Sequence, residues 1–312
     1  MKIGILKEIN RNEKRVVLRP REVKKLVKKG HTVLVETTAG RGVNFSDEDY
    51  KSVGATILPR EKIYSNSEML LKLRSPTDNE FTKINNKILL SMLHTHQNPK
   101  RIKFIKENKI TAIEMESIKN QFNERYVDAT DITGESGVIY SLRFLDKIPC
   151  ECRVLILGYG RVGAGAIEMC NKLHMKVKIL RKVEYKNIKH FIKNKDLIIN
   201  AIAWPEEERK KKEFIITRDM LKLLNPNSVI LDLSVDYPNP IETCKPTTLT
   251  QPWFKLDGVI HISIYGYPGL VPSSSVRRYG RQLLPIVLEI ANNGIKNLDK
   301  TNLGKDIINS II

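Results

Sequence analysis

Cysteine is scarce in this sequence, and its spacing argues against a metal site. Four cysteines occur among 312 residues. Only Cys150 and Cys152 lie close together, and a single C-x-C pair lacks the second pair of ligands that a structural zinc site requires. Cys170 and Cys244 have no cysteine beside them in the sequence. We interpret all four as reduced structural thiols, and the sequence predicts no metal site.

Long hydrophobic runs are absent as well. Lys7 and Glu8 interrupt the amino-terminal apolar segment before it is long enough to form the core of a secretory signal. No later segment has the roughly 20 consecutive apolar residues that a membrane-spanning helix needs. We therefore expect a cytoplasmic protein that has no membrane partner.

Acidic residues are outnumbered by basic ones. The chain has 53 Lys and Arg against 35 Asp and Glu, which gives a formal net charge of +18. Such an excess raises the question of nucleic acid as a partner. The lysines, however, are distributed through nearly every segment, without a basic tail or interleaved aromatic residues. This distribution favours a solvated basic surface that attracts anionic metabolites, and we expect no nucleic-acid partner.

Short apolar segments alternate with charged amphipathic segments in the first third of the chain. The expected strands are residues 3–6, 31–36, 69–73, 88–92 and 111–115, and the expected helices are residues 20–29, 46–53 and 98–108. This alternation predicts a parallel sheet with helices on its faces.

A second series of strand candidates follows a polar stretch at residues 120–131. Its expected strands are residues 153–157, 176–180, 196–202, 229–235 and 258–264, and its expected helices are residues 133–145 and 281–292. A chain of this length can form two cores. We predict an α/β protein of two Rossmann-like parallel-sheet domains with a cleft between them. Residues 1–128 plus 281–312 would form the substrate domain, and residues 129–280 the NAD(P)-binding domain.

A glycine-rich turn carries the strongest signal for a cofactor. A strand candidate leads into this turn and a helix candidate follows it. In a G-x-G-x-x-G turn the first glycine allows the tight turn, the second lets the backbone reach a pyrophosphate, and the third lets helix and strand pack closely. This context favours a dinucleotide at the helix N-terminus over a turn without a ligand. The expected cofactor-binding residues are Gly158, Tyr159, Gly160, Arg161, Val162 and Gly163.

The residues after the next strand candidate bear on the choice of cofactor. An NAD enzyme usually places Asp or Glu there for the ribose hydroxyls. This chain has Arg181 and Lys182, which cannot accept those hydroxyl protons but suit a 2′-phosphate. We predict NADP(H) over NAD(H). In the alternative, both cations point to solvent, Glu184 binds the ribose and the cofactor is NAD.

Three further segments carry a family resemblance. They are residues 2–20, residues 69–72 together with Leu93 and His94, and residues 232–275. With the glycine turn, they make the chain similar to the alanine dehydrogenase, pyridine nucleotide transhydrogenase and saccharopine dehydrogenase superfamily. The resemblance implies a homo-oligomer that uses a nicotinamide cofactor and small-molecule substrates, a 2-oxo acid and an amine.

The resemblance also implies roles for four residues. Arg15 would bind the substrate carboxylate, and Lys72 would bind the carboxylate or the carbonyl oxygen. His94 would transfer protons, because the intrinsic pKa of imidazole lies nearest neutrality. Asp236 would orient the site and balance its charge.

Each of these residues has an alternative interpretation. Arg15 could be one more surface cation, and Asp236 could only initiate the proline-rich turn that follows it. Lys72 lies beside three apolar residues at a predicted strand end, so a surface role is less easily assigned to it. His96 would share the face of His94 in an extended segment and competes for the role of proton shuttle.

The chain also departs from the alanine-specific members of the superfamily. Tyr237-Pro238-Asn239 replaces their Gln-Gly-Gly, Gly266-Tyr267-Pro268 replaces their Asn-Met-Pro, and Arg181 stands where they carry an acidic residue. The last feature and the shorter chain resemble the N5-(carboxyethyl)ornithine synthase branch.

Three functions therefore stay open. The first is an NADP(H)-preferring amino-acid dehydrogenase that reductively aminates a 2-oxo acid such as pyruvate. The second is a synthase of the carboxyethylornithine or saccharopine dehydrogenase type that joins a 2-oxo acid to ornithine or lysine. The third, more remote, is a non-catalytic nucleotide-binding subunit like those of transhydrogenases.

Overall fold

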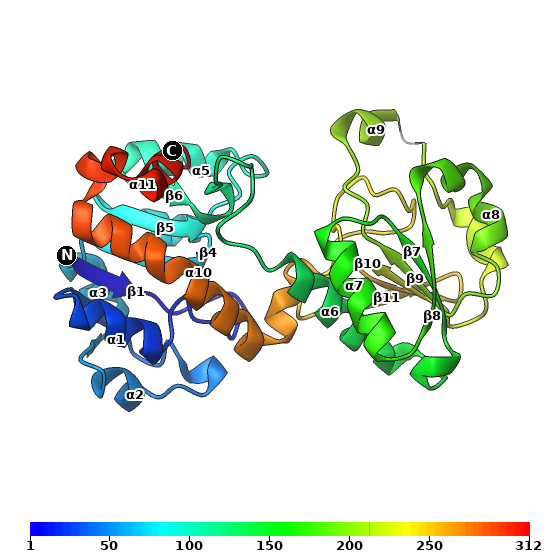
Figure 1. Ribbon diagram of the computed structural model, residues 1–312, viewed down its shortest axis with the longest axis horizontal. Coiled ribbons are helices and arrows are strands. Elements are labelled where there is room, and N and C mark those ends of the chain that lie inside the picture. Colours follow the sequence, from blue (N-terminus) through cyan, green and yellow to red (C-terminus); the bar gives the residue numbers. More distant parts are fainter. Residues whose placement is uncertain (212) are drawn as a thin grey trace. The chain divides into compact units, whose positions relative to one another are not determined.

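The computed structural model describes residues 1–211 and 213–312 and contains two compact units (Figure 1). Unit 1 comprises residues 1–128 and 272–312, and unit 2 comprises residues 129–271. Each unit has its own sheet and its own hydrophobic core, and each is described here by itself.

Unit 1 is built on a six-stranded sheet in the order β3-β2-β1-β4-β5-β6, in which all neighbouring strands are parallel. Its strands are β1 (Lys2–Ile5), β2 (Thr32–Glu36), β3 (Thr56–Leu58), β4 (Met69–Arg74), β5 (Ile88–Met92) and β6 (Thr111–Glu114). Its helices are α1 (Pro20–Lys28), α2 (Asp47–Lys51), α3 (Arg60–Asn66), α4 (Asp78–Phe81), α5 (Lys100–Glu107), α10 (Pro272–Asn293) and α11 (Asn302–Ile308). Because helices cover both faces of such a sheet, its strands are nearly continuous apolar runs.

Unit 2 has a second six-stranded sheet, in the order β11-β12-β10-β9-β7-β8. Its strands are β7 (Arg153–Leu157), β8 (Lys176–Leu180), β9 (Leu197–Asn200), β10 (Val229–Asp232), β11 (Trp253–Leu256) and β12 (Val259–Ile262). Its helices are α6 (Thr130–Ser141), α7 (Arg161–Lys172), α8 (Ile188–Phe191) and α9 (Glu206–Lys211). Only the edge strand β11 is antiparallel among the strands of the described residues. The predicted α/β class with two Rossmann-like sheets is confirmed.

Some elements differ from the sequence prediction. Strands β3 and β11 and helix α3 had not been expected, and both of these strands lie at sheet edges, where the apolar pattern is weak. Helix α10 begins at Pro272, whereas a helix was expected only from residue 281. The Pro-Ser-Ser-Ser sequence there suggested a turn, but proline is tolerated in the first turn of a helix because its missing N–H has no partner to lose. The chain therefore returns to unit 1 at residue 272, before the boundary at residue 281 that the sequence predicts.

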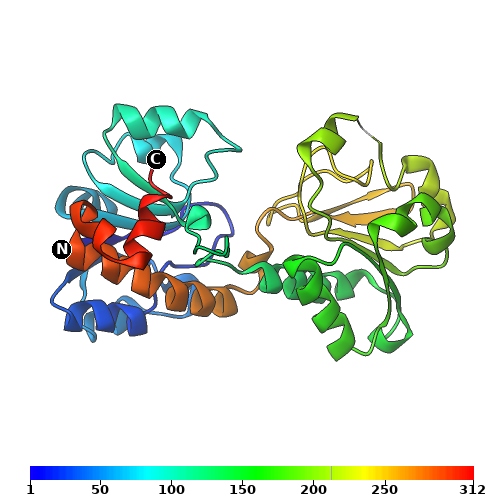
Figure 2. The same cartoon turned by 45° about the horizontal axis from the view of Figure 1, so that its top comes forward.

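Helix α10 joins the two sequence segments of unit 1. It contacts α1 on one side and α11 on the other, as Figures 1 and 2 show. After α11, Ile311 forms an antiparallel bridge with Ile113 of β6. Residues 272–312 are therefore part of the core of unit 1.

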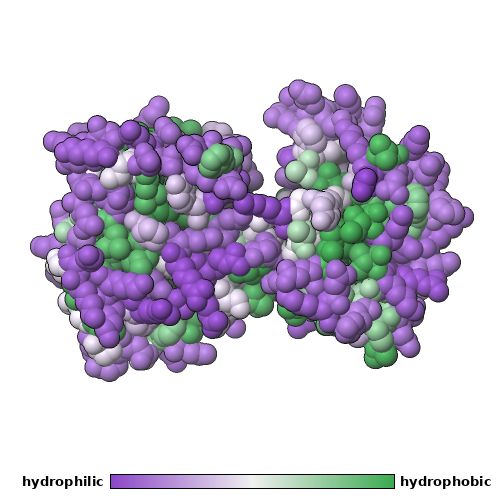
Figure 3. All heavy atoms as spheres, in the orientation of Figure 1, coloured by the Kyte–Doolittle hydropathy of each residue, from purple (hydrophilic) through white to green (hydrophobic). Residues whose placement is uncertain are grey.

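The surface reflects the distribution of charge in the sequence. Hydrophilic residues cover most of the visible face of each unit (Figure 3). No helix in the described part of the chain is long and apolar enough to cross a membrane.

Candidate functional site

In unit 1, polar side chains gather at the carboxyl ends of three neighbouring strands. Strand β4 lies between β1 and β5, so the segments that follow these strands lie side by side. Glu8 follows β1, Lys72 lies near the end of β4, and His94 comes after β5. The register pairs Arg74 of β4 with Met92 of β5. The topology therefore brings Lys72 and His94 to the same edge of one sheet.

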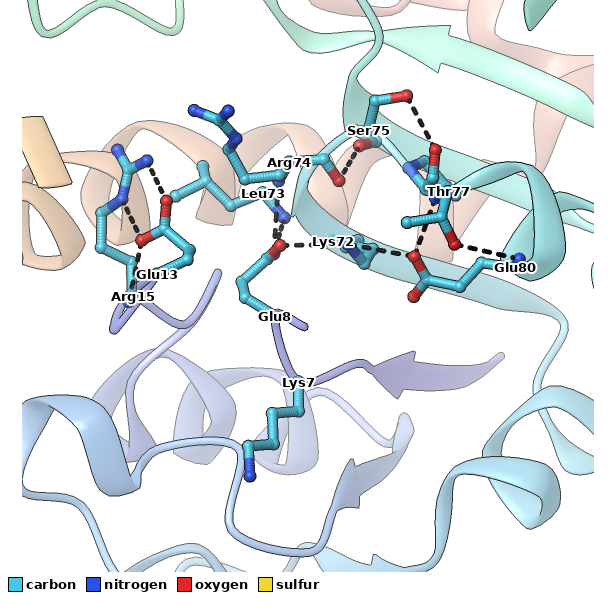
Figure 4. Close-up of polar contacts among 12 residues, drawn as sticks. Lys7, Glu8, Glu13, Arg15, Lys72, Leu73, Arg74, Ser75, Thr77 and Glu80 are labelled. Atoms are coloured by element: carbon cyan, nitrogen blue, oxygen red, sulfur yellow. Dashed lines mark hydrogen bonds and ion pairs between the residues drawn. The ribbon is translucent and has the colours of Figure 1, made fainter. Parts of the chain in front are cut away.

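Lys72 is completely buried and lies between two carboxylates (Figure 4). Its Nζ is 3.1 Å from Oε2 of Glu8 and 3.5 Å from Oε2 of Glu80. The carboxylate of Glu8 also accepts hydrogen bonds from the backbone N–H groups of Leu73, at 2.7 Å, and Arg74, at 3.2 Å. Burial raises the pKa of Glu8, although Lys72 opposes that shift. The ammonium group is thus held in one place by groups that do not reach solvent.

Arg15 is also buried, with 4% of its surface exposed, so it is not a surface cation. Its guanidinium donates two hydrogen bonds to Glu13, from Nε to Oε1 at 2.7 Å and from Nη2 to Oε2 at 2.6 Å (Figure 4). The guanidinium also lies 5.9 Å from the centre of the Tyr279 ring. Burial opposes ionisation of Glu13, but the hydrogen bonds from Arg15 outweigh it and lower the pKa of Glu13. A rigid, desolvated guanidinium of this kind suits a carboxylate.

Arg74 connects these groups electrostatically. Its positive charge lowers the pKa of Glu13 and contributes to the lowered pKa of His94. Arg15 and Glu8 also interact through their charges. The site in unit 1 therefore combines these cations with the carboxylates of Glu8 and Glu13 at one sheet edge.

His94 lies in an unusual backbone conformation and is held by Glu116. Its φ is 46°, in the left-handed region that residues other than glycine seldom adopt. Oε1 of Glu116 accepts a hydrogen bond from the backbone N–H of His94 and lies 3.1 Å from its Nδ1. Glu116 follows β6, the neighbour of β5 in the sheet. The carboxylate therefore fixes both the backbone and the ring of His94.

Burial affects the two partners in complementary ways. It lowers the pKa of His94 to about 4, with further contributions from nearby cationic groups, among them Arg101 and Arg74. It raises the pKa of Glu116 to about 7. Oε2 of Glu116 is buried and has no hydrogen-bond partner among the described residues. Both shifts favour an uncharged imidazole near neutral pH.

His96 differs from His94 in its surroundings. Residues 95–97 form a turn, so the segment is not extended. The His96 side chain is exposed and its ring meets that of His94 edge-on, with centroids 6.2 Å apart. The partners Glu8, Glu13 and Glu116 were not predicted from the sequence. The acidic residues after β6 could have been considered, because β6 neighbours the strand that precedes His94.

In unit 2, the glycine turn connects β7 to α7. Gly158 has a φ of +92°, and a Cβ there would lie 2.7 Å from the carbonyl oxygen of Ala201. A Cβ on Gly163 would lie 2.7 Å from the carbonyl oxygen of Gly158. Gly160 differs, because its φ is −87° and a Cβ there would meet no atom within 4 Å. The fold itself therefore requires the first and third glycines but not the second, and the open space at the second fits a pyrophosphate.

The residues after β8 include two exposed cations and one carboxylate with local partners. Arg181 and Lys182 are exposed at the end of the strand. Glu184 instead accepts a hydrogen bond from the backbone N–H of Arg181 at 2.9 Å and lies 3.6 Å from Nζ of Lys178. Nζ of Lys182 lies 3.8 Å from a carboxylate oxygen of Glu208. Glu184 is thus engaged in closing the local turn.

Asp236 lies in the loop after β10 and has a cationic partner. Nη2 of Arg209 lies 2.9 Å from its Oδ2. Burial raises the pKa of Asp236, while Arg209 opposes that shift. The preceding residue, Val235, has a φ of 55°, which is strained for a β-branched residue. Asp236 belongs to unit 2, whereas Arg15, Lys72 and His94 belong to unit 1.

Comparison with known proteins gives consistent matches along the chain. A family model described as "Alanine dehydrogenase/PNT, N-terminal domain" matches residues 4–133, and one described as "Alanine dehydrogenase/PNT, C-terminal domain" matches residues 179–310. Alanine dehydrogenase 2 of Staphylococcus aureus (strain Mu50 / ATCC 700699) is 30% identical, over 97% of this chain and 90% of that protein.

Solved structures agree with these matches. An L-alanine dehydrogenase has a TM-score of 0.89 and 27% identity, and the match covers 100% of this chain and 94% of that one. A transhydrogenase from Sinorhizobium meliloti has a TM-score of 0.80 and 21% identity, covering 92% of this chain and 93% of that one. The second likeness concerns the fold alone.

Proposed function

The chain belongs to the alanine dehydrogenase/PNT family. We propose that within this family it is an NADPH-preferring amino-acid dehydrogenase that reductively aminates a 2-oxo acid such as pyruvate. It is a nicotinamide-dependent oxidoreductase that acts on an amino donor. The observation that carries the proposal is the buried Lys72, held at the same sheet edge as His94. A fully buried ammonium group at the carboxyl edge of a parallel sheet is a candidate for binding substrate, in addition to its ion pair with Glu8.

The glycine turn and α7 would bind the dinucleotide. The backbone N–H groups at the start of α7, from Arg161 onward, would meet the pyrophosphate, and the bare Gly160 would let it approach. Tyr159 and Val162 would flank it. When bound, the cofactor supplies a hydride to the carbon of the C=N bond.

Replacing Gly160 with Ala tests the cofactor site directly. The fold has room for the methyl group, so we expect the free energy of unfolding to change by less than about 0.5 kcal/mol. The methyl group would occupy the path of the pyrophosphate, so the Kd for NADPH should rise at least about tenfold. Fluorescence titration and thermal melting measure the two effects. In the control Gly163→Ala, the Cβ would meet backbone at 2.7 Å, so the melting temperature should fall.

Arg181 and Lys182 are the basis for preferring NADPH. Both would contact the 2′-phosphate, and Arg181 would do so through a forked, charge-assisted contact. Glu184 already accepts the backbone N–H of Arg181, which argues against its use for the ribose hydroxyls. Equal kcat/KM values for NADPH and NADH, or a preference for NADH, would contradict this assignment.

Three side chains of unit 1 would bind the 2-oxo acid and transfer its protons. Arg15 would bind its carboxylate, and Lys72 would donate a hydrogen bond to its carbonyl oxygen and so polarise the carbon. His94 would take and return protons as the carbonyl becomes carbinolamine, imine and amine. In unit 2, Asp236 would hold the positive charge that develops on nitrogen.

Glu116 should make the rate depend on pH. With a pKa of about 7, its carboxyl ionises as the pH rises through that value, and only the ionised form stabilises a His94 that has gained a proton. We expect kcat/KM for the 2-oxo acid to rise through about pH 7. Glu116→Gln should remove this limb and lower kcat/KM above pH 7 by about 10²-fold. Glu114→Gln is the matched control. Glu114 binds Thr95 and Ser117, and its charge contributes to the raised pKa of Glu116, so this variant should shift the limb to lower pH without removing it. Loss of the limb in this control would contradict the role of Glu116.

NADPH oxidation with pyruvate and a series of amines tests the function itself. Ammonia, ornithine, lysine and glutamate are supplied in turn, and absorbance at the NADPH band is followed. Turnover with at least one amine is expected. If NADPH binds but no amine supports its oxidation with any 2-oxo acid, the chain is better described as a nucleotide-binding subunit of the transhydrogenase type. We further propose a cytoplasmic homo-oligomer, which fractionation and sedimentation would test.

A further inference from the structure

Asp236 is not an isolated carboxylate in this chain, because Arg209 is bound to it. Arg209 lies on α9, which follows β9, and Asp236 lies in the loop after the neighbouring strand β10. Their side chains are 29% and 22% exposed, so solutes can reach both. The 2.9 Å contact therefore places one positive and one negative charge together at the carboxyl edge of the sheet in unit 2.

Both members of this pair are held by their surroundings. Nε of Arg209 donates a hydrogen bond of 2.7 Å to the carbonyl oxygen of Trp204, a residue that is 5% exposed. The loop of Asp236 is tied to the loop before α9, because the hydroxyl of Ser234 donates to the carbonyl oxygen of Ile202 at 2.6 Å. The two charges thus have a fixed spacing before any substrate binds, which reduces the entropy lost on binding.

The buried carboxylate of Asp232 supports the ion pair of Arg209 and Asp236 through hydrogen bonds to neighbouring segments. Asp232 is fully buried at the end of β10 and accepts hydrogen bonds from Asn200 at 2.9 Å, Asn239 at 2.8 Å and Ser263 at 2.5 Å. Asn200 ends β9, and Asn239 closes the loop that contains Asp236. The network therefore connects the two loops that carry the pair.

The charges of the pair bear on which nitrogen donor fits. The charge of Asp236 is already neutralised by Arg209, so Asp236 attracts an ammonium ion only weakly. An ammonium ion also has no anionic group that could bind Arg209. An amino acid carries a carboxylate and an ammonium group a few bonds apart, and each can exchange with one member of the pair. We propose that Arg209 is a specificity-determining residue that binds the carboxylate of an amino acid acting as nitrogen donor, while Asp236 binds that donor's ammonium group. This inference rests on the proposed function.

The exchange also explains how Asp236 becomes available. When the incoming carboxylate binds the guanidinium, Asp236 loses its only cationic partner among the described residues and can bind the donor's ammonium group. A donor without a carboxylate must break the ion pair without replacing it. The enzyme would therefore favour an amino acid over ammonia and over simple amines.

Steady-state kinetics of the full chain with NADPH and saturating pyruvate tests this inference. Ornithine, lysine and glutamate are compared with ammonium chloride and with putrescine and cadaverine, which lack the carboxylate. We expect kcat/KM for at least one amino acid to exceed that for the carboxylate-free amines at least about tenfold. Arg209→Ala should raise the KM for that amino acid about 10- to 100-fold, with the KM values for pyruvate and NADPH unchanged. Arg209→Lys should restore part of the loss.

Lys210→Ala is the matched control on the same helix. Its side chain is 73% exposed and pairs with Glu206 at 3.0 Å, so its KM values should equal those of the wild type. Circular dichroism melting confirms that each variant folds. Equal losses for amino acids and carboxylate-free amines in Arg209→Ala would overturn the inference, because Arg209 would then only position Asp236.

Turnover of the wild type with each donor distinguishes failure of the role of Arg209 from failure of the proposed function. Turnover with ammonia alone would overturn the role of Arg209 and leave the proposed reductive amination in place. Absence of NADPH oxidation with every donor would overturn both.

Discussion

Replacing His94 with Ala should lower kcat for NADPH oxidation by about 10²- to 10⁴-fold, the range that a positioned acid–base group contributes. The imidazole is uncharged near neutral pH because burial lowers its pKa to about 4. It can therefore take a proton as the C–N bond forms, and alanine cannot. NADPH binding should be unchanged, because the glycine turn lies in the other unit. Stopped-flow kinetics and fluorescence titration give the two quantities.

His96→Ala is the control for this experiment. His96 is exposed, whereas His94 is held by the carboxylate of Glu116. Its removal should change kcat by less than about threefold, in line with a surface substitution. Full activity in His94→Ala combined with loss in His96→Ala would show that the proton shuttle is His96.

Replacing Lys72 with Met should destabilise the protein by about 3–5 kcal/mol, because it leaves the buried carboxylate of Glu8 without its cation. Met preserves most of the volume, so a cavity contributes little to the loss. Glu80 keeps its ion pair with Arg60 at 2.6 Å, which confines the effect to Glu8. Urea unfolding monitored by circular dichroism measures the change. Activity should also be lost, because no donor remains for the substrate carbonyl.

The double variant Glu8→Gln with Lys72→Met separates charge from packing. Glutamine is neutral, and its oxygen can still accept the backbone N–H groups of Leu73 and Arg74. We expect it to recover more than half of the stability lost in Lys72→Met, without recovery of activity. Equal destabilisation of the single and double variants would show that the uncompensated charge of Glu8 is not the cause.

The elements that the sequence predicts well are those with a strong local signal. Strand β7, the glycine turn and helix α7 follow one another as an apolar run, a turn and an amphipathic segment. The roles of the three glycines are separable only in the structure, because the sequence does not show that Gly160 has open space while Gly163 meets backbone. Edge strand β11 has no such signal, since alternate residues face solvent.

The partners of the site residues could not be predicted, because they depend on strand order. Glu8 and Lys72 are 64 residues apart and meet because β1 and β4 are neighbours. Glu116 meets His94 for the same reason, through β5 and β6. Arg209 lies in a short charged helix, and the sequence of this helix is typical of a solvent-exposed segment. Its ion pair with Asp236 depends on the contact between two loops.

The order of the units along the chain affects how the protein folds during synthesis. Unit 2 is one continuous segment that is complete once residue 271 has left the ribosome. Unit 1 needs α10, α11 and the bridge from Ile311 to Ile113, all of which are made after unit 2. Domains generally fold as units while the chain emerges. Unit 2 can therefore form first, while strands β4 and β5 of unit 1 wait for residues 272–312, and during that interval their apolar faces are open to chaperones.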